Sequence, residues 1–295
     1  MMMRLPRVLR LLPVPLACLV IASASSSPEQ MIASGSIDEL IRTLSGRSDA
    51  TSVNLLSRAY YGIEQWDNAV RNGEKANAAN PLSAASLAKK AKAEFEQAVK
   101  LDPANVQAHA DLAEYYTDAP SIMGGGTDKA RDQATQVARY DQATSHWILA
   151  IVAEKEKRYS DAEKELQEAN KVAKNPAQYW MNLASFYRRR SQPDNMQKAI
   201  SQALAQPNKS AEVYYNAASE LLSAGRDFPA AAQYVKQYLG SNAMVEDAPA
   251  FRAHYLLGQI YEKMGNKSEA AAEYKASLAL ASGFAPASKA LARVQ

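Results

Sequence analysis

Small residues recur along this chain at intervals that constrain its fold more than any other feature. Alanines stand where one helix must approach another closely, at Ala69, Ala91, Ala130, Ala162, Ala231 and Ala270. The successive gaps are 22, 39, 32, 69 and 39 residues, and the gap of 69 holds two units with Met196 at the middle position. Most gaps cluster around the period of about 34 residues that is typical of a helix–turn–helix repeat. Apolar residues also recur at i, i+3, i+4 and i+7 rather than alternating, so we expect an all-α chain of stacked helix pairs.

The last unit shows the most complete pattern. The segment His254-x-x-Leu257-Gly258-x-x-Tyr261 is followed by Gly265-Asn266 and then by Ala270-x-x-x-Tyr274. Trp180-x-x-Leu183-Ala184-x-x-Tyr187 repeats its first half, and Ala91-x-x-x-Phe95-x-x-Ala98 with Asp102-Pro103 repeats its second half. Over roughly residues 50–282 this spacing resembles the signature of the tetratricopeptide repeat family. The resemblance, in particular to secreted bacterial members with a long Gly-rich turn, implies a tetratricopeptide-type helix–turn–helix solenoid that binds other proteins.

The repeat sets the expected domain organisation. We expect residues 50–282 to form the solenoid and residues 283–295 to form a C-terminal capping helix. Residues 25–49 are expected to hold a flexible lead-in, rich in Ser, Pro and Ala, and an N-terminal helix over Ile37–Leu44 that caps the start. Two irregularities are expected, since residues 82–100 supply a second helix without room for a first one and Ala119–Lys129 holds about five extra residues. Because each repeat contacts only its neighbours, we expect damage at one end to spread inward unit by unit.

The first residues have the order of a secretory signal peptide. A basic leader with Arg4, Arg7 and Arg10 precedes an apolar run from Leu11 to Ile21, and Ala22-Ser23-Ala24 forms a small-x-small cleavage site. We therefore expect residues 1–24 to be removed and the protein to be exported, into the periplasm or out of the cell. The alternative is a lipoprotein anchored through Cys18, because Leu16-Ala17-Cys18 is similar to a lipobox. The match is imperfect, since Pro15 stands where that motif usually has leucine.

Removal of the leader changes the charge balance. It contains three of the 34 basic residues and no acid, so the mature chain has 34 − 3 = 31 basic and 31 acidic residues. A net charge of zero offers no basic field for nucleic acid. The mature chain contains no further apolar run long enough to span a membrane, and with Cys18 removed it has no cysteine.

The sequence contains no pattern that is typical of an enzyme. Gly124-Gly125-Gly126 lacks the G-K-[ST] ending and the preceding strand of a phosphate-binding loop, so we interpret it as a turn with positive-φ glycines, after which Thr127 or Asp128 caps a helix. His109, His146 and His254 each stand where the repeat has its opening aromatic residue, which predicts a packing role. We therefore expect no catalytic, cofactor-binding or metal-binding residues.

The concave face is the expected binding surface, because first helices line the inside of such solenoids. The inward stripe is predicted by the residue after the opening aromatic and by positions four and seven or eight further on. Its members in the first unit are Asn54, Arg58 and Tyr61. The residues predicted to contact a partner are Trp147, Met181, Arg188, Tyr215, Arg252, Tyr255 and Gln259. Arg188-Arg189-Arg190 has two interpretations, a solvated helix end or a site for a carboxylate or phosphate.

The sequence thus predicts a non-enzymatic, exported scaffold or adaptor that binds a protein or peptide on its concave face. The alternative function is a structural or lipid-anchored component of a cell-envelope complex, in which the solenoid only spaces other parts. We expect no cofactor in either case.

Overall fold

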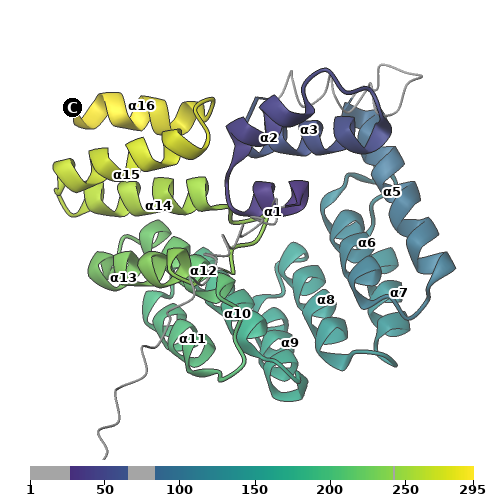
Figure 1. The fold of residues 1–295 in the computed structure, drawn as a ribbon. Coiled ribbons are helices and arrows are strands. Elements are labelled where there is room, and N and C mark those ends of the chain that lie inside the picture. Colours follow the sequence, from purple (N-terminus) through teal and green to yellow (C-terminus); the bar gives the residue numbers. More distant parts are fainter. Residues whose placement is uncertain (1–26, 66–83, 242) are drawn as a thin grey trace, which may run out of the picture.

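The computed structural model describes residues 27–65, 84–241 and 243–295, and within these ranges every regular element is a helix. Five helix pairs follow one another along the chain (Figure 1). Their first helices are α6 (Val106–Asp118), α8 (Gln142–Lys155), α10 (Ala177–Arg189), α12 (Glu212–Ser223) and α14 (Ala250–Lys263). Their second helices are α7 (Thr127–Val137), α9 (Tyr159–Val172), α11 (Pro193–Ala205), α13 (Phe228–Leu239) and α15 (Lys267–Leu280). The prediction of an all-α helix-pair solenoid is confirmed.

One buried position on each second helix, an alanine in four of the five pairs, explains the close approach within the pair. Ala130, Ala162, Met196, Ala231 and Ala270 occupy equivalent places on the second helices, and all five have an exposed fraction of 0%. Gly258 on α14 is needed for the same reason, because a Cβ atom there would lie 2.5 Å from Cε1 of Tyr274 on α15. The stacked pairs thereby bury faces that a single pair cannot bury alone.

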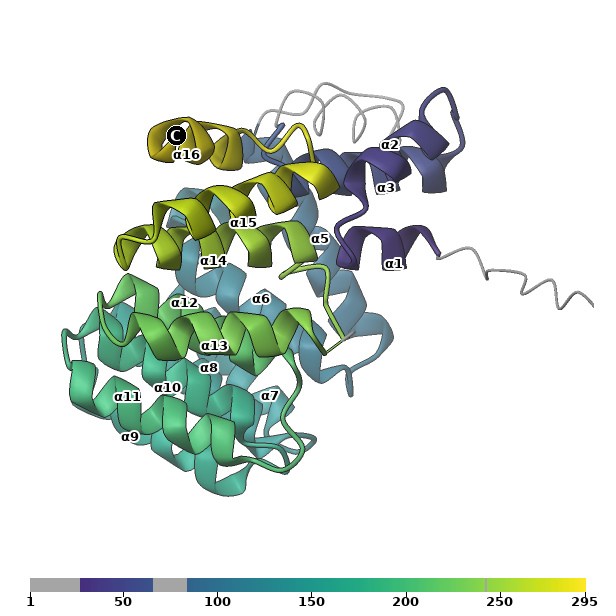
Figure 2. The same cartoon turned by 60° about the vertical axis from the view of Figure 1, so that its left-hand side comes forward.

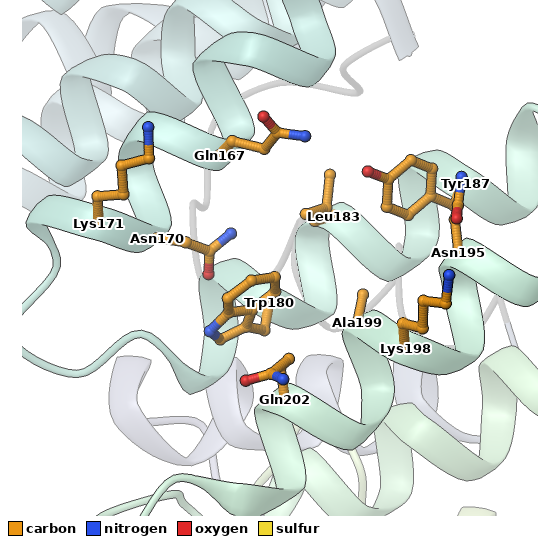
Figure 3. Close-up of a pocket in the computed structure, with 10 residues that line it drawn as sticks. All are labelled: Gln167, Asn170, Lys171, Trp180, Leu183, Tyr187, Asn195, Lys198, Ala199 and Gln202. Atoms are coloured by element: carbon orange, nitrogen blue, oxygen red, sulfur yellow. The ribbon is translucent and has the colours of Figure 1, made fainter.

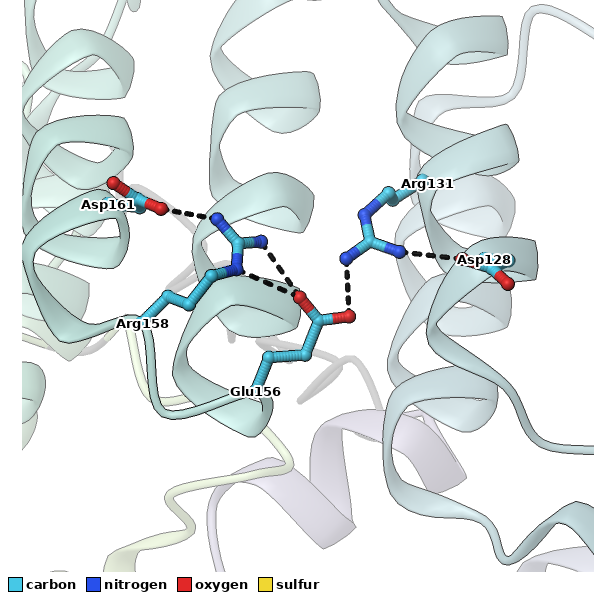
Figure 4. Close-up of polar contacts among 5 residues, drawn as sticks. All are labelled: Asp128, Arg131, Glu156, Arg158 and Asp161. Atoms are coloured by element: carbon cyan, nitrogen blue, oxygen red, sulfur yellow. Dashed lines mark hydrogen bonds and ion pairs between the residues drawn. The ribbon is translucent and has the colours of Figure 1, made fainter.

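Together the pairs form a curved array. The first helices lie on the inside of the curve and the second helices lie on the outside (Figures 1 and 2). Neighbouring pairs are also joined by polar contacts. Between α7, α8 and α9, the carboxylate of Glu156 accepts hydrogen bonds from Arg131 and from Arg158, and each arginine also binds an aspartate (Figure 4). This network connects α7 to the turn that leads from α8 to α9.

The N-terminal helices close the curve against the C-terminal end. These helices are α1 (Pro28–Ala33), α2 (Ile37–Leu44) and α3 (Ala50–Gly62), and they lie beside the start of α14 (Figure 1). One apolar cluster joins Ile37, Leu40 and Leu56 to Phe251 and Phe284. Polar contacts surround it. The Arg252 guanidinium donates to the Gly62 carbonyl over 2.9 Å, and the Ser282 amide donates to Asp38 over 2.9 Å.

This closure differs from the expected linear array. Contacts between segments more than 180 residues apart mean that the last unit supports the first helices directly. The part of the chain expected as a flexible lead-in contains α1, which begins with a capping box between Ser27 and Gln30. Helix α2 covers the predicted Ile37–Leu44, but it packs in the cluster shared with the C-terminal end.

Two further helices complete the described part. Helix α16 (Ala285–Val294) packs on α15 through Ala290 and Val294, at the place predicted for the C-terminal cap. Helix α5 (Ala84–Leu101) precedes α6 and contacts it. None of the helices in the described ranges is long and apolar enough to cross a membrane. Residues 1–24, with Cys18, lie outside the described residues, as do residues 66–83.

Candidate functional site

Three first helices have a histidine at the opening position, and each histidine contacts the paired second helix. His146 Nδ1 lies 2.7 Å from Glu165 Oε2, and His254 Nδ1 lies 2.7 Å from Glu273 Oε2, each across 19 residues. His109 is fully buried and lies 2.8 Å from Gln133 Oε1 across 24 residues. The difference, 24 − 19 = 5, agrees with the predicted insertion between α6 and α7. All three histidines therefore join two helices of a pair, and the described residues contain no group of His, Cys, Asp and Glu suited to a metal ion.

The residues that follow the opening position lie mostly between units. Met181 has an exposed fraction of only 3%, so the prediction that it contacts a partner is wrong. Trp147 is half-buried and packs against two core clusters at once. The Tyr215 ring lies 5.6 Å from that of Tyr238, and burial raises the pKa of the Tyr215 phenol. Tyr255 contacts the rings of Phe284 and Tyr274. A helix that stacks on two neighbours uses these positions for packing, which leaves Trp147, Tyr215 and Tyr255 partly exposed.

The arginines at the end of α10 bind acids on neighbouring first helices. Arg188 donates to Glu220 on α12 over 2.5 Å, and Ser185 donates to the other oxygen of the same carboxylate. Arg189 makes two hydrogen bonds of 2.8 Å to Glu154 on α8. These pairs cross from unit to unit on the inner helices. Neither of the two interpretations offered for this arginine run included them, because the acids lie 32 and 35 residues away in the sequence.

A groove of 390 Å³ lies across α6, α8 and α10. Ile151 is its apolar residue, and this half-buried side chain is absent from the apolar clusters of the described residues. Glu114 stands at the rim, where burial first and then Asp118 and Asp111 raise the pKa of its carboxyl. Lys155 lies opposite, 3.7 Å from Asp118. Ile151 stands four residues after Trp147 and therefore falls on the predicted inward stripe, but it is not among the residues predicted to contact a partner.

Arg252 and Gln259 have local roles. Arg252 binds the Gly62 carbonyl and lies 3.7 Å from Glu64, so it belongs to the closure between the two ends of the chain. A cavity of 640 Å³ lies at that junction. There Arg58 forms a bidentate pair with Glu246. Gln259 donates to the Tyr255 hydroxyl over 3.3 Å. The side chains of Asn54 and Tyr61 are not among those described.

The glycine-rich turn packs on itself. Gly124 is left-handed with φ of 88°, as predicted for a positive-φ turn. A Cβ atom on Gly125 would lie 1.8 Å from the Ala119 carbonyl oxygen, whereas one on Gly126 would meet nothing within 4 Å. Gly126 is the N-cap of α7, so the prediction that Thr127 or Asp128 caps this helix is wrong. The turn presents Ile122, of which 85% is exposed.

Comparison with solved structures finds several proteins that are similar to this chain. Yeast Tom70 superposes with a TM-score of 0.53 at 16% identity, over 87% of this chain and 57% of that one. YrrB, described as a tetratricopeptide repeat protein with an unusual peptide-binding site, has a TM-score of 0.43 at 15% identity, over 66% and 96%. PilF of Pseudomonas aeruginosa has a TM-score of 0.44 at 17% identity, over 80% and 97%. The likeness to Tom70 shows the fold.

Sequence comparison identifies the repeat itself. No curated protein sequence matches the chain. The family model described as tetratricopeptide repeat matches residues 215–284, from within α12 to the residue before α16. The buried position on the second helix recurs in the three preceding helix pairs, and the paired opening positions recur in α6–α7 and α8–α9. Residues 215–284 are therefore tetratricopeptide repeat sequence, within a chain that has the tetratricopeptide-type solenoid fold.

Proposed function

We propose that this protein is an exported, non-enzymatic scaffold or adaptor whose inner face binds a segment of a partner protein. The observation that carries the proposal is the groove across α6, α8 and α10, with Ile151 half-buried in it and outside the described core clusters. A side chain of this kind gains from being covered by an apolar residue of a partner. The fold adds support, because stacked helix pairs create extended concave surfaces for binding.

The rim of the groove favours a partner segment with polar residues of both signs beside its apolar anchor. Glu114 and Asp118 lie on α6, while Lys155 and the Arg189–Glu154 pair lie on α8 and α10. Pairs that remain solvated contribute little to affinity but discriminate between partners. A short helix or extended peptide is the expected ligand, since its successive side chains would meet successive first helices. Export is supported by the order of charges and apolar residues in residues 1–24.

The test is a selection of peptides from a random library on the purified protein, followed by measured affinities for two matched variants. Ile151→Lys places a charge in the groove and is expected to weaken the selected peptides at least about tenfold. Ile122→Lys makes the same substitution on the exposed glycine-rich turn and is expected to leave the affinity unchanged. Circular dichroism establishes that both variants are folded. Equal binding by the Ile151 variant, or loss of binding only in the Ile122 variant, would show that the inner groove is not the site.

A further inference from the structure

One helix pair departs from the contact that the other four make. At the opening position and its partner, the other pairs place two large side chains together: His109 with Gln133, His146 with Glu165, Tyr214 with Tyr234, and His254 with Glu273. In the pair α10–α11 the opening residue is Trp180, and its partner position holds only Ala199. A pocket of 410 Å³ lies there on the outer side of the array, between α9, α10 and α11 (Figure 3). Its size is within the range of small-molecule sites.

A buried polar group forms part of the pocket wall. Asn170 on α9 has an exposed fraction of 8%, and its amide lies beside Trp180 (Figure 3). Nδ2 donates to the Leu166 carbonyl over 2.9 Å, but Oδ1 has no hydrogen-bond partner among the described residues. Buried polar atoms are nearly always paired, so an orphaned oxygen next to a pocket calls for a specific explanation.

Comparison with the other units shows that packing does not require this asparagine. Eight residues after Ala130, Ala162, Met196, Ala231 and Ala270, the equivalent positions hold Ala138, Asn170, Leu204, Leu239 and Leu278. Four of the five units therefore have an apolar residue where α9 has an amide. A leucine at this place would fill space without an unsatisfied oxygen. Asn170, which replaces an apolar residue, and Ala199, which replaces a large one, both line the same pocket.

The charged residues that line the pocket are all basic. Lys171 and Lys198 line it on opposite sides of Trp180 (Figure 3), and its lining contains no acidic residue. Lys171 is bound to Glu168 at 2.8 Å, whereas Lys198 is exposed and has no partner in the described part of the chain. Trp180 is half-buried, and its indole N–H also makes no hydrogen bond there. The free groups are thus a flat aromatic surface, an ammonium group and a hydrogen-bond acceptor.

We propose that this outer pocket binds a small organic anion with a flat ring and a hydrogen-bond donor. The ring would stack on Trp180 above Leu183 and Ala199, the acid would pair with Lys198, and an N–H or O–H would donate to Asn170 Oδ1. Stacking on Trp180 holds the face of the ring, and the charge-assisted hydrogen bond to Lys198 holds the acid at its edge. Together these two contacts define the orientation of the ligand. The site is separate from the inner groove, because its residues lie on α9, α10 and α11 around the outer side.

The test uses four matched probes on the full protein: indole-3-acetate, the neutral indole-3-acetamide, the cation tryptamine, and 1-methylindole-3-acetate, which lacks the ring N–H. The readout is the indole N–H resonance of Trp180 in NMR titrations, assigned among three tryptophans by Trp180→Phe. Indole-3-acetate is expected to shift this resonance and to bind about tenfold more tightly than each of the other three. The proposal is overturned if no probe shifts the resonance, or if tryptamine or the methylated acid binds as tightly.

Two variants separate binding from folding. Asn170→Leu introduces the leucine that three other units have at this position. The variant is expected to have a higher thermal midpoint and to bind indole-3-acetate about tenfold more weakly. Lys198→Glu on the exposed rim is expected to weaken binding of indole-3-acetate by a similar factor without changing the midpoint. Lys164→Glu, at an exposed residue of α9 that does not line the pocket, serves as its control. Unchanged affinity in the Lys198 variant refutes the proposal, even if the Asn170 variant does not fold. A stabilised Asn170→Leu protein that still binds normally also refutes it.

Discussion

Truncation of Phe251 tests whether the two ends of the chain support each other. Phe251 begins α14, is fully buried, and has its ring 5.1 Å from that of Phe284 in an edge-to-face arrangement. It also contacts the N-terminal helices, since a Cβ on Gly62 would lie 3.9 Å from its ring and one on Gly35 would lie 2.9 Å from its amide nitrogen. Phe251→Ala therefore removes a side chain that two distant segments share.

The expected loss in the free energy of unfolding follows from the complete burial of Phe251. Replacement of a fully buried phenylalanine by alanine costs about 3–5 kcal/mol in the free energy of unfolding. The polar contacts that remain at the closure, such as Arg252 to the Gly62 carbonyl, contribute only about 0.5–1.5 kcal/mol each and are partly exposed. They are too weak to hold α1–α3 in place, because ordering these helices costs conformational entropy. A loss of 3–5 kcal/mol corresponds to opening of the N-terminal helices about 10²- to 10⁴-fold more often.

The assay is native-state hydrogen exchange of Phe251→Ala beside Phe186→Ala. Phe186 is a matched control, because it is equally buried but lies on α10 in the large central cluster. Exchange within residues 28–62 is expected to accelerate in the Phe251 variant and to stay close to the parent in the Phe186 variant. If residues 28–62 keep their protection in the Phe251 variant, the chain behaves as a linear array and the closure contributes no stability.

Four other predictions concern separate parts of the molecule. Gly125→Ala should destabilise the protein by about 1–3 kcal/mol or more, whereas Gly126→Ala should be nearly neutral in urea unfolding, because only the first Cβ meets a backbone carbonyl. His109→Ala should cost about 2–4 kcal/mol in the same assay, since it leaves a cavity and an unpaired buried amide. Hydrogen bonding, foremost from Arg158, lowers the pKa of Glu156 below its reference value of 4.5, so its stabilisation is present above pH 4.5 and is lost as the pH falls through the folded value. Thermal midpoints of Glu156→Gln should therefore change less with pH below 4.5. Intact-mass measurement on protein from the cell envelope should show a chain that begins at residue 25, and lipid on the leader cysteine or a retained initiator methionine would contradict this.

Local spacing predicted most of the fold. The alanine positions on α7, α9, α13 and α15 are buried as expected, and Met196 takes the same place on α11. The histidines at the opening positions contact their paired helices, and even the extra residues before α7 are visible in the contact of His109 with Gln133. These features were predictable because each depends on residues within one unit, at separations that the helix period fixes.

The candidate sites were less predictable, because they depend on contacts between units. The positional rule identifies the inner side of each first helix, but it does not distinguish a residue that stacks on the next unit from one that faces a partner. Met181 is buried for this reason, while Ile151 is left in the groove. Arg252 was predicted to contact a partner, but it binds the carbonyl of Gly62, 190 residues away in the sequence. The curvature that brings these ends together is a sum over all units, and no local pattern encodes it.

A repeat protein offers its own internal comparison, which links stability to function without any homologue. When equivalent positions in several units carry residues that pack well, a unit that departs from them gives up stability unless the departure has another use. Asn170 and Ala199 depart in this way on the second helices of two successive pairs, and the result is an unpaired oxygen and an unfilled space in one pocket. Two independent changes that both weaken packing at the same place are better explained by a ligand than by drift. The same reasoning separates this pocket from the opening positions of the other four pairs, where substitutions between units preserve the contact and therefore indicate structure alone.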